Sequence, residues 1–244
     1  MSQKNKWKKY LFLKQFEGLA PYLPKTRMLT EHNFRKFIEE YGKVILKPVY
    51  GRGGRGVIQV SPLENHRYEI HREKKKKRFI GKKWAYKYIK SKIGSSPYMV
   101  QRRIPLAKVD NRPFDMRIIV QRKKHSDTWV ITAKAAKVAG KGYIVTNNTR
   151  SKGKLLHVES ALHRSSLYGY SQHELLSRIE KVALRAARRL SLLFPHHRIY
   201  GLDMGVDRSG DIWIIETNLF PAMSHFRKLG DQTMYYRIKS YKKG

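Results

Sequence analysis

The sequence predicts an α+β fold, and two observations carry this prediction. Stretches typical of strands are mixed with helical stretches, without the regular strand–helix–strand alternation of parallel α/β proteins. The chain has 244 residues, of which 41% are apolar, and this is enough for a sizeable core in one large or two small domains. Disorder of the whole chain is excluded, because its high charge accompanies an ordinary apolar content.

The first third of the chain indicates a basic opening segment, a helix and two short strands. The opening segment has too few apolar residues in a row for a secretory signal, and we expect a basic helix or strand there. Thr30 is the expected N-cap of a helix over 31–41 that ends at Gly42. Strands are expected at 44–46 and 57–60, on either side of a glycine-rich loop.

Residues 67–92 carry the densest positive charge. Twelve lysines and arginines stand against two glutamates, which gives a local net charge of +10. The four lysines at 74–77 predict either an exposed hairpin tip or loop, or a dedicated anion-binding patch. Aromatic residues spaced among the later lysines indicate an amphipathic helix that ends near Gly94.

The rest of the chain predicts longer strands and one long helix. Ser171 and Glu174 form a capping box, which marks the start of an amphipathic helix. The turn at 207–210 joins the last two strands as a hairpin. Strands are expected at 98–101, 115–121, 129–138, 199–206 and 211–216, and a polar loop at 146–154.

The charge limits the class of partner. The 53 Lys and Arg residues exceed the 18 Asp and Glu residues by a formal +35, which favours anionic partners. Two classes stay open: a module that binds nucleic acid or another anionic surface, and an enzyme for phosphorylated substrates. The absence of cysteine excludes disulfides and thiol catalysis and fits a cytoplasmic protein. No apolar run reaches the ~18 residues that a membrane span needs.

The loop GRGGRG could bind phosphate. It contains Gly51, Gly53, Gly54 and Gly56, but a strand follows it, so it is neither a Rossmann fingerprint nor a Walker loop. A glycine hairpin of this kind can close its backbone N–H groups over phosphates, with Lys47 as a point charge just before it. The alternative is a mobile basic turn.

Polar residues interrupt three strands that otherwise favour burial. Asp203 lies in one, and Glu216 and Asn218 share a face of the next. Their oxygen atoms suit Mg²⁺ that bridges phosphates, although pairing with buried arginines or capping of turns would also account for the acids. Asp115 and Arg117 share a face of the third strand. There the arginine either braces a phosphoryl group or forms a structural salt bridge.

The order of these features resembles the ATP-grasp fold. The sequence is similar to the YheC/YheD-type ATP-grasp family, the endospore coat-associated proteins, over nearly the whole chain. The matching segments are 21–27, 46–48, 51–56, 100–104, 112–117, 144–147, 201–203 and 215–218.

The resemblance implies two α+β subdomains, at 1–101 and 102–244, that clamp ATP. It also implies a role for each matching residue. Lys6 and Lys47 would face the phosphates under the glycine flap, Arg117 would act on the transferring phosphoryl group, and Asp115 and Asn147 would lie nearby. The hinge that reads the adenine would be Val100, Gln101, Arg102, Arg103 and Ile104, and the ligands of Mg²⁺, with Mn²⁺ as the alternative ion, would be Asp203, Glu216 and Asn218.

The implied activity is that of a carboxylate–amine ligase. Such enzymes phosphorylate a carboxylate with ATP, and an amine or thiol then attacks the acyl phosphate. Because the chain begins almost at the core, most or all of the N-terminal pre-ATP-grasp domain is expected to be absent, and the loop after Asn147 has fewer glycines than expected.

The rival hypothesis is a non-catalytic basic scaffold that binds an acidic polymer or coat partner. Under either hypothesis we expect an acidic acceptor or polyanionic partner. Nucleic acid is less favoured, because no recognised binding motif is present. The expected location is cytoplasmic, with association with the spore coat.

Overall fold

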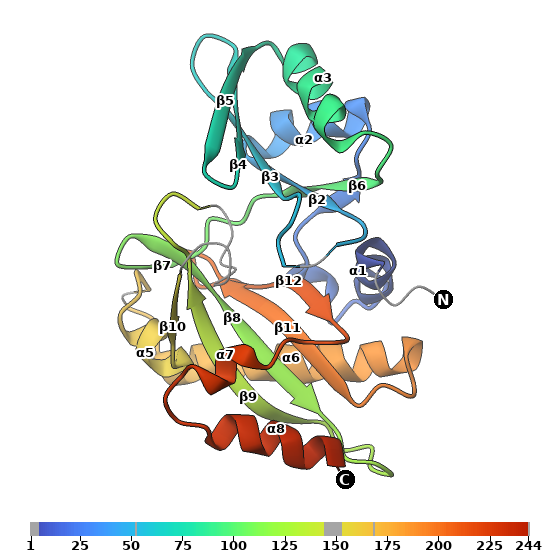
Figure 1. Cartoon of the computed structure of the whole chain (residues 1–244), viewed down its shortest axis with the longest axis vertical. Helices are drawn as coiled ribbons and strands as arrows, with labels where there is room; N and C mark the ends of the chain where they lie inside the picture. Colours follow the sequence, from blue (N-terminus) through green and yellow to red (C-terminus); the bar gives the residue numbers. More distant parts are fainter. Residues whose placement is uncertain (1–4, 52, 144–152, 168, 244) are drawn as a thin grey trace.

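Two antiparallel sheets, one in each half of the chain, form the frame of the structure (Figure 1). The computed structural model describes residues 5–51, 53–143, 153–167 and 169–243. The first sheet has the strand order β1-β6-β2-β3-β4-β5, and the second has the order β10-β9-β8-β11-β12, with β7 paired to β8. The predicted α+β class is confirmed.

The first sheet is covered on one face by two helices. Thr30 caps the first of them, since its Oγ1 accepts from the backbone N–H of Asn33, and Gly42 ends it with a φ of +65°. Apolar residues of both helices pack on the sheet to form a core of their own. The elements are β1 (Thr26–Met28), α2 (Glu31–Tyr41), β2 (Val44–Pro48), β3 (Ile58–Pro62), β4 (Arg67–Arg72), β5 (Lys75–Ile80), α3 (Lys82–Ile93) and β6 (Tyr98–Arg102).

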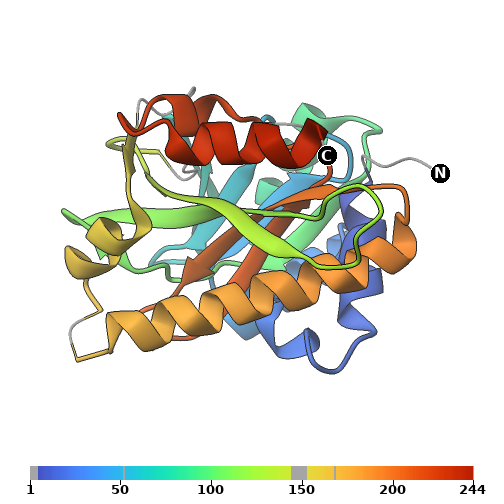
Figure 2. The same ribbon diagram turned by 90° about the horizontal axis from the view of Figure 1, so that it is seen from below.

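The second sheet is covered on both faces. Figure 2 shows it between the long helix α6 (Gln172–Leu193) and the C-terminal helix α8 (Thr233–Lys243). Ser171 caps α6 as predicted, because its Oγ accepts from the backbone N–H of Glu174. The other elements are β7 (Lys108–Val109), β8 (Arg112–Gln121), β9 (Val130–Val138), β10 (Lys154–Leu156), α5 (Val158–His163), β11 (Ile199–Val206), β12 (Ile212–Asn218) and α7 (Ser224–Arg227).

The start of the chain packs with the second sheet. Helix α1 (Lys6–Lys14) lies against α6, and a 3₁₀ turn, η1 (Ala20–Tyr22), lies against β12. Tyr10, Leu13, Leu19 and Leu23 belong to the core of the second sheet. The opening segment is therefore a helix, and it joins the core of the C-terminal half although the sequence places it before the first sheet.

The lysine run differs from a simple hairpin tip. Only Glu73 and Lys74 form the turn, and Lys75 is the first residue of β5, the edge strand. The segment expected as a loop at 146–154 lies largely outside the described residues, and its last residue, Lys154, begins β10. Within the described part of the chain, no helix is both long and apolar enough to cross a bilayer.

Candidate functional site

A cavity lies between the two sheets, and most of the predicted site residues line it. Its volume is about 180 Å³. The predicted residues on its wall are Lys6, Lys47, Gly53, Gly54, Gln101, Arg102, Arg103, Ile104, Asp115, Arg117, Asp203, Glu216 and Asn218. Gly51, Gly56 and Val100 do not line it, and Asn147 lies outside the described residues.

Strand register brings the polar residues of the second sheet together. Asp203 on β11 lies opposite Arg117 on β8 and Glu216 on β12. Directly opposed residues on neighbouring strands project from the same face of a sheet, so the three side chains meet on one face. β12 carries one extra residue at this point, Ile215, and both Ile215 and Glu216 line the cavity. An extra residue of this kind is a β-bulge, which redirects side chains locally.

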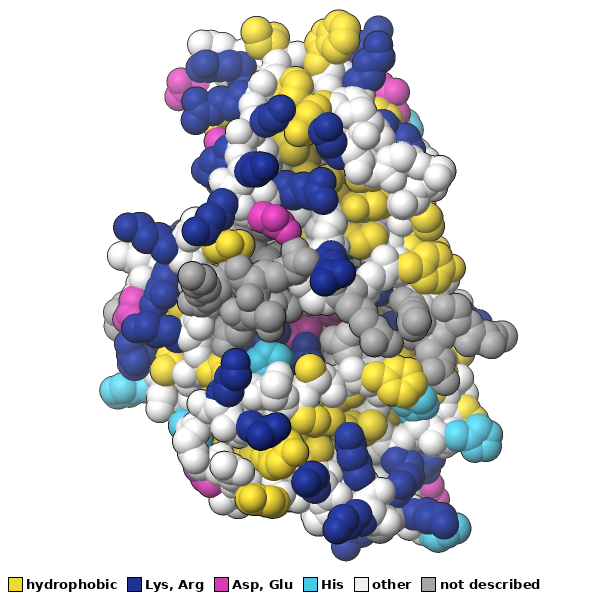
Figure 3. Space-filling view, viewed as in Figure 1, with side chains coloured by type: hydrophobic (Ala, Val, Ile, Leu, Met, Phe, Trp, Pro, Cys, Tyr) yellow, Lys and Arg dark blue, Asp and Glu magenta, His cyan; other side chains and the backbone are white. Residues whose placement is uncertain are grey.

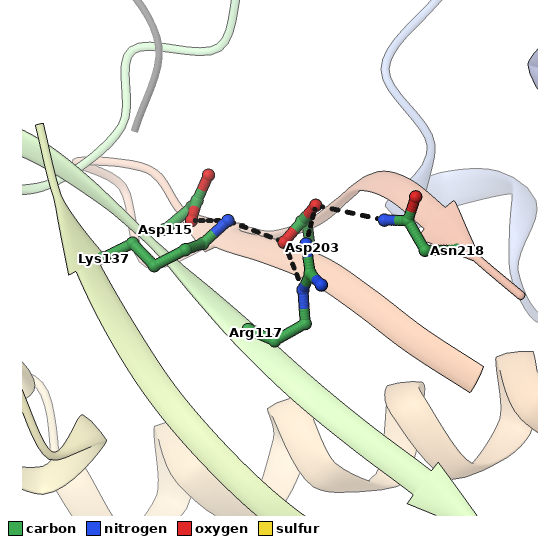
Figure 4. A network of polar contacts seen from close by, with 5 residues as sticks. All are labelled: Asp115, Arg117, Lys137, Asp203 and Asn218. Atoms are coloured by element: carbon green, nitrogen blue, oxygen red, sulfur yellow. Dashed lines mark hydrogen bonds and ion pairs between the residues drawn. The ribbon is translucent and has the colours of Figure 1, made fainter. Parts of the chain in front are cut away.

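Asp203 is held by cations on two sides (Figure 4). Arg117 donates from Nε to Oδ1 of Asp203 at 2.8 Å and from Nη2 to Oδ2 at 2.9 Å. The Nζ of Lys137 lies 2.7 Å from the same Oδ1 and 2.8 Å from Oδ1 of Asp115. Asn218 donates from Nδ2 to Oδ2 of Asp203 at 3.3 Å. The acidic side chains of two strands are thus joined into one buried network.

The network balances its own charge. Burial alone would raise the pKa of Asp203, but the adjacent Arg117 and Lys137 hold that pKa well below its ordinary range. Burial alone would lower the pKa of Lys137, yet Asp115 and Asp203 raise it above the ordinary lysine value. Against the effect of burial, Asp203 also raises the pKa of Arg117. The network contains two basic and two acidic side chains, so their formal charges cancel. Any excess positive charge that faces the cavity must come from other residues.

Lys47 and Lys6 supply such charge from two different elements, β2 and α1. Lys47 on β2 donates from Nζ to Oε1 of Gln101 at 2.6 Å, and Gln101 is fixed in turn by Thr26. Burial lowers the pKa of Lys47 to about 8, although Glu216 works against this shift. The Nζ of Lys6 on α1 lies 3.5 Å from Oε1 of Glu216.

The segment after β6 connects the two halves. The guanidinium of Arg102 lies 5.7 Å from the ring centre of Tyr41 and 5.6 Å from that of Trp213, one ring from each half. Arg103 donates from Nε to Oε1 of Gln59 at 2.7 Å. The backbone N–H groups of Arg102 and Arg103 already donate to main-chain carbonyls. A ligand would therefore meet other main-chain atoms of the segment 101–104.

The glycine loop needs its glycines for different reasons. Gly53 and Gly54 adopt φ values of +64° and +71°, which L side chains rarely adopt, and both face the cavity. Gly56 also has a positive φ, and a Cβ there would lie 2.5 Å from Oη of Tyr98. The absence of a side chain at Gly56 therefore lets the loop lie close to Tyr98 of the first sheet. Val100, another predicted site residue, is fully buried in the core of that sheet.

Two buried lysines of the site were missed by sequence reasoning. Lys137 had one usable signal, since it and Lys134 are the two charged residues of an alanine-rich strand. Lys9 had none, because it sits among other lysines at the start of the chain. Its Nζ donates to the carbonyl of Thr217 at 2.5 Å, beside the cavity, and burial lowers its pKa to about 8.

The predicted metal ligands form a set of three oxygen-bearing side chains. Among the described residues, no three of His, Asp and Glu cluster as a metal site, so the set depends on the amide of Asn218. The nitrogen and oxygen of an amide are assigned from its hydrogen bonds, and a rotated Asn218 would present its oxygen. Among the residues that the structure describes, Glu216 makes one ion pair, with Lys6 at 3.5 Å. The donors fit a hard divalent ion, provided that Asp203 loosens its contact with Lys137 or Arg117.

Comparison with known proteins agrees with this geometry. The family model described as YheC/D-like ATP-grasp matches residues 2–242. The endospore coat-associated protein YheD of Bacillus subtilis (strain 168) is 25% identical over 234 residues, which cover 91% of this chain and 49% of YheD. YheC of the same organism is 24% identical over 225 residues, 89% of this chain and 60% of YheC. The chain thus spans about half to three-fifths of these relatives.

Solved structures share the fold. D-cycloserine synthetase DcsG superposes with a TM-score of 0.57 at 12% identity, over 99% of this chain and 70% of that one. The D-alanyl-alanine synthetase A of Vibrio cholerae O1 superposes with a TM-score of 0.57 at 11% identity, over 99% of this chain and 64% of that one. The ATP-grasp ligase PsnB, in a complex with a precursor variant, Mg and ADP, superposes with a TM-score of 0.56 at 13% sequence identity. The match covers 98% of this chain and 58% of PsnB. The fold is therefore the ATP-grasp fold.

Proposed function

Because the chain belongs to the YheC/D-like ATP-grasp family, we propose that it binds ATP with Mg²⁺ between the two sheets and acts as a carboxylate–amine ligase associated with the spore coat. One observation carries the proposal: basic residues from both halves and acidic residues of the second sheet line one cavity. The structure of one fold neighbour, PsnB, includes Mg and ADP, and two curated relatives are coat-associated proteins.

The cavity offers cations for a triphosphate. Lys47 faces it from the first sheet and Lys6 from α1, and the glycine loop places Gly53 and Gly54 on the same wall. Arg117 uses two N–H groups on Asp203, and a guanidinium has five, so others remain for a phosphoryl oxygen. The cavity is smaller than the ~300 Å³ at which ligand pockets usually begin. A whole nucleotide therefore requires part of the wall to move.

Glu216, Asn218 and Asp203 would hold the metal ion. A divalent ion at such a site neutralises charge on the phosphates and orients them for transfer. Lys137 would keep Asp115 and Asp203 in place, since its ammonium group contacts both carboxylates.

The proposed reaction has two steps. An oxygen of the acceptor carboxylate attacks the γ-phosphorus of ATP, the bond to the β,γ-bridging oxygen breaks, and ADP leaves. The amine nitrogen then attacks the acyl carbon, the carbon–oxygen bond to phosphate breaks, and the nitrogen loses a proton as the amide forms. Phosphoryl transfer depends mainly on positioning and charge neutralisation, and this is the contribution that Lys6, Lys47 and Arg117 would make. A thiol would form a thioester by the same path.

One observation favours a second function. Protein side chains alone surround the carboxylate of Asp203, because Arg117, Lys137 and Asn218 all donate to it. Such a network also suits a basic scaffold that keeps the fold for binding alone, with an acidic polymer or coat protein as its partner.

Release of ADP distinguishes the two functions. The protein is incubated with ATP, Mg²⁺ and pools of carboxylates and amines, and a ligase releases ADP only when a suitable carboxylate is present. Arg117→Met serves as the inactive control, with its fold checked by circular dichroism. ATP binding without carboxylate-dependent ADP release across the pools would contradict the ligase proposal and favour the scaffold.

A further inference from the structure

Strand β5 leaves one edge of the first sheet open. One side of β5 pairs with β4, and no described segment pairs with the other (Figure 1). In an antiparallel ladder, alternate residues direct their N–H and C=O groups away from the partner strand. Six residues at about 3.3 Å each give about 20 Å of such edge. An extended polypeptide can add to an edge of this kind as a further strand.

The side chains of β5 determine which chain can add. Lys76 and Arg78 lie on one face, where their nitrogens are 3.0 and 3.6 Å from carboxylate oxygens of Glu69. Lys75 and Lys77 lie on the other face, beside α3. Positive charges on an edge strand keep sheets of the same protein from pairing with one another. The same charges attract a strand that carries carboxylates, since opposite charges on neighbouring strands stabilise pairing.

A groove between β5 and α3 extends this surface. Its volume is about 480 Å³, and it combines an apolar floor with a basic rim and one acidic residue. Figure 3 shows Lys and Arg side chains gathered over this part of the molecule. The floor is formed by Ile58, Ile70 and Ile89, and the rim by Arg72, Glu73, Lys75, Lys77, Tyr88 and Lys92.

The aromatic rings and the open backbone beside β5 bear on the choice between a polypeptide and a nucleic acid. Single-stranded nucleic acids stack their bases on accessible aromatic rings. Here the ring of Tyr88 has the ammonium groups of Lys77 and Lys92 at 5.3 and 5.4 Å, and Phe79 at 4.7 Å. Trp84 has Lys87 at 5.0 Å. Trp84 is exposed, so the rings do not decide between the two. The open edge of β5 decides for a polypeptide, because its N–H and C=O groups pair with another polypeptide backbone.

The edge leads toward the cavity. At the turn before β5, the Nζ of Lys74 lies 5.5 Å from the ring centre of Tyr143. Tyr143 follows β9, which carries the cavity residue Lys137. A segment that lies along β5 therefore has one end directed at the half of the molecule that contains the acidic network.

We propose that an acidic, extended polypeptide segment binds by adding to the edge of β5, with its carboxylates on the lysines of that strand. This inference rests on the proposed function in one respect: the bound polypeptide is taken to carry the carboxylate that the ligase would phosphorylate. Binding at the edge needs no nucleotide, so it is measured without ATP.

The binding test uses a fluorescein-labelled decaglutamate peptide and fluorescence anisotropy at low salt. We expect saturable binding that weakens as salt is added. Lys75→Gln with Lys77→Gln should raise the dissociation constant about tenfold, as expected for the loss of two surface ion pairs. Lys181→Gln with Arg188→Gln removes two exposed charges from α6 and should leave the constant unchanged. Equal effects of the two double variants would overturn the proposal.

Hydrogen–deuterium exchange tests the strand addition itself. The peptide should slow exchange of backbone amides at 75–80, and unchanged exchange in the bound state would contradict pairing at the edge. A labelled twelve-residue oligothymidylate that binds more tightly and displaces the peptide would overturn the choice of a polypeptide. Peptide binding without ADP release in the turnover assay would count against the ligase alone, whereas ATP turnover without binding at β5 would count against this inference alone.

Discussion

Replacing Lys137 with methionine should destabilise the fold strongly, because Lys137 is a buried cation between two carboxylates. Its Nζ is 2.7 Å from Asp203 and 2.8 Å from Asp115, and its side chain is only 6% exposed. Removing one partner from a buried ion pair costs about 3–5 kcal/mol, since the remaining charge stays desolvated. Arg117 would still hold Asp203, so we expect the lower end, about 3 kcal/mol.

Lys134→Met is the matched control. Lys134 lies on the same strand and also bridges two carboxylates, with its Nζ 2.9 Å from Glu159 and 2.9 Å from Glu180. Those carboxylates are more exposed than Asp115 and Asp203, and surface ion pairs contribute about 0–1 kcal/mol. The control should therefore lose about 1 kcal/mol at most.

Urea unfolding at pH 7, followed by circular dichroism, measures both variants. The free energy of unfolding is obtained by linear extrapolation. The interpretation of the network as a buried, mutually dependent set is refuted if Lys137→Met loses no more than Lys134→Met.

The pH dependence of the network and of other positions gives further predictions. The pKa of Asp203 is lowered in the folded state, so the ionised carboxylate stabilises the fold above its unfolded pKa, and this stabilisation is lost on acidification. In urea unfolding, the difference in free energy of unfolding between wild type and Asp203→Asn should therefore shrink below about pH 4. A difference that stays constant with pH would contradict this. The pKa of Lys9 is lowered to about 8 in the folded state, so above pH 8 the folded state binds fewer protons than the unfolded state. The wild type should therefore gain stability relative to Lys9→Met between about pH 8 and pH 10. Parallel plots of unfolding free energy against pH for the two proteins would contradict the lowered pKa. Gly56→Ala would place a Cβ 2.5 Å from Oη of Tyr98 at a position of positive φ. Gly94→Ala is the control, because Gly94 also has a positive φ, +59°, but open space around it. In urea unfolding, Gly56→Ala should lose about 1–3 kcal/mol more stability than Gly94→Ala, and equal losses would show that the contact with Tyr98 contributes no destabilisation.

Local signals allowed much of the fold to be predicted from the sequence. Thr30 and Ser171 cap helices where the capping pattern indicates, and their hydrogen bonds are present. The strand pattern around Asp115 and Arg117 also holds, as does the final hairpin around 207–210. These features depend on residues close together in the chain, which a sequence pattern can report.

Long-range packing accounts for what could not be predicted. Helix α1 joins the core of the second sheet and packs against α6, which begins more than 150 residues later in the chain. No local pattern encodes that partner. Lys137 pairs with Asp203 only because β8, β9 and β11 lie side by side. The sequence left a salt bridge and a phosphate contact open for Arg117, and the salt bridge with Asp203 is present.

The lysine run shows the same limit on a smaller scale. Its charge predicted exposure, and the residues are exposed. The pattern did not place Lys75, Lys76 and Lys77 on an edge strand, because an edge is defined by the order of strands in the sheet and not by the strand itself.

Calorimetric titration of ATP with and without Mg²⁺ shows whether the cavity between the two sheets binds nucleotide and metal together. We expect Mg²⁺-dependent binding to the wild-type protein. The double variant Glu216→Ala with Asn218→Ala should lose this binding while its circular dichroism stays unchanged. Lys181→Gln with Arg188→Gln, remote on α6, should bind as the wild type does. Unchanged Mg²⁺-dependent affinity in the Glu216 and Asn218 double variant, or no binding of ATP to the wild type, would contradict the assignment of this cavity as a nucleotide and metal site.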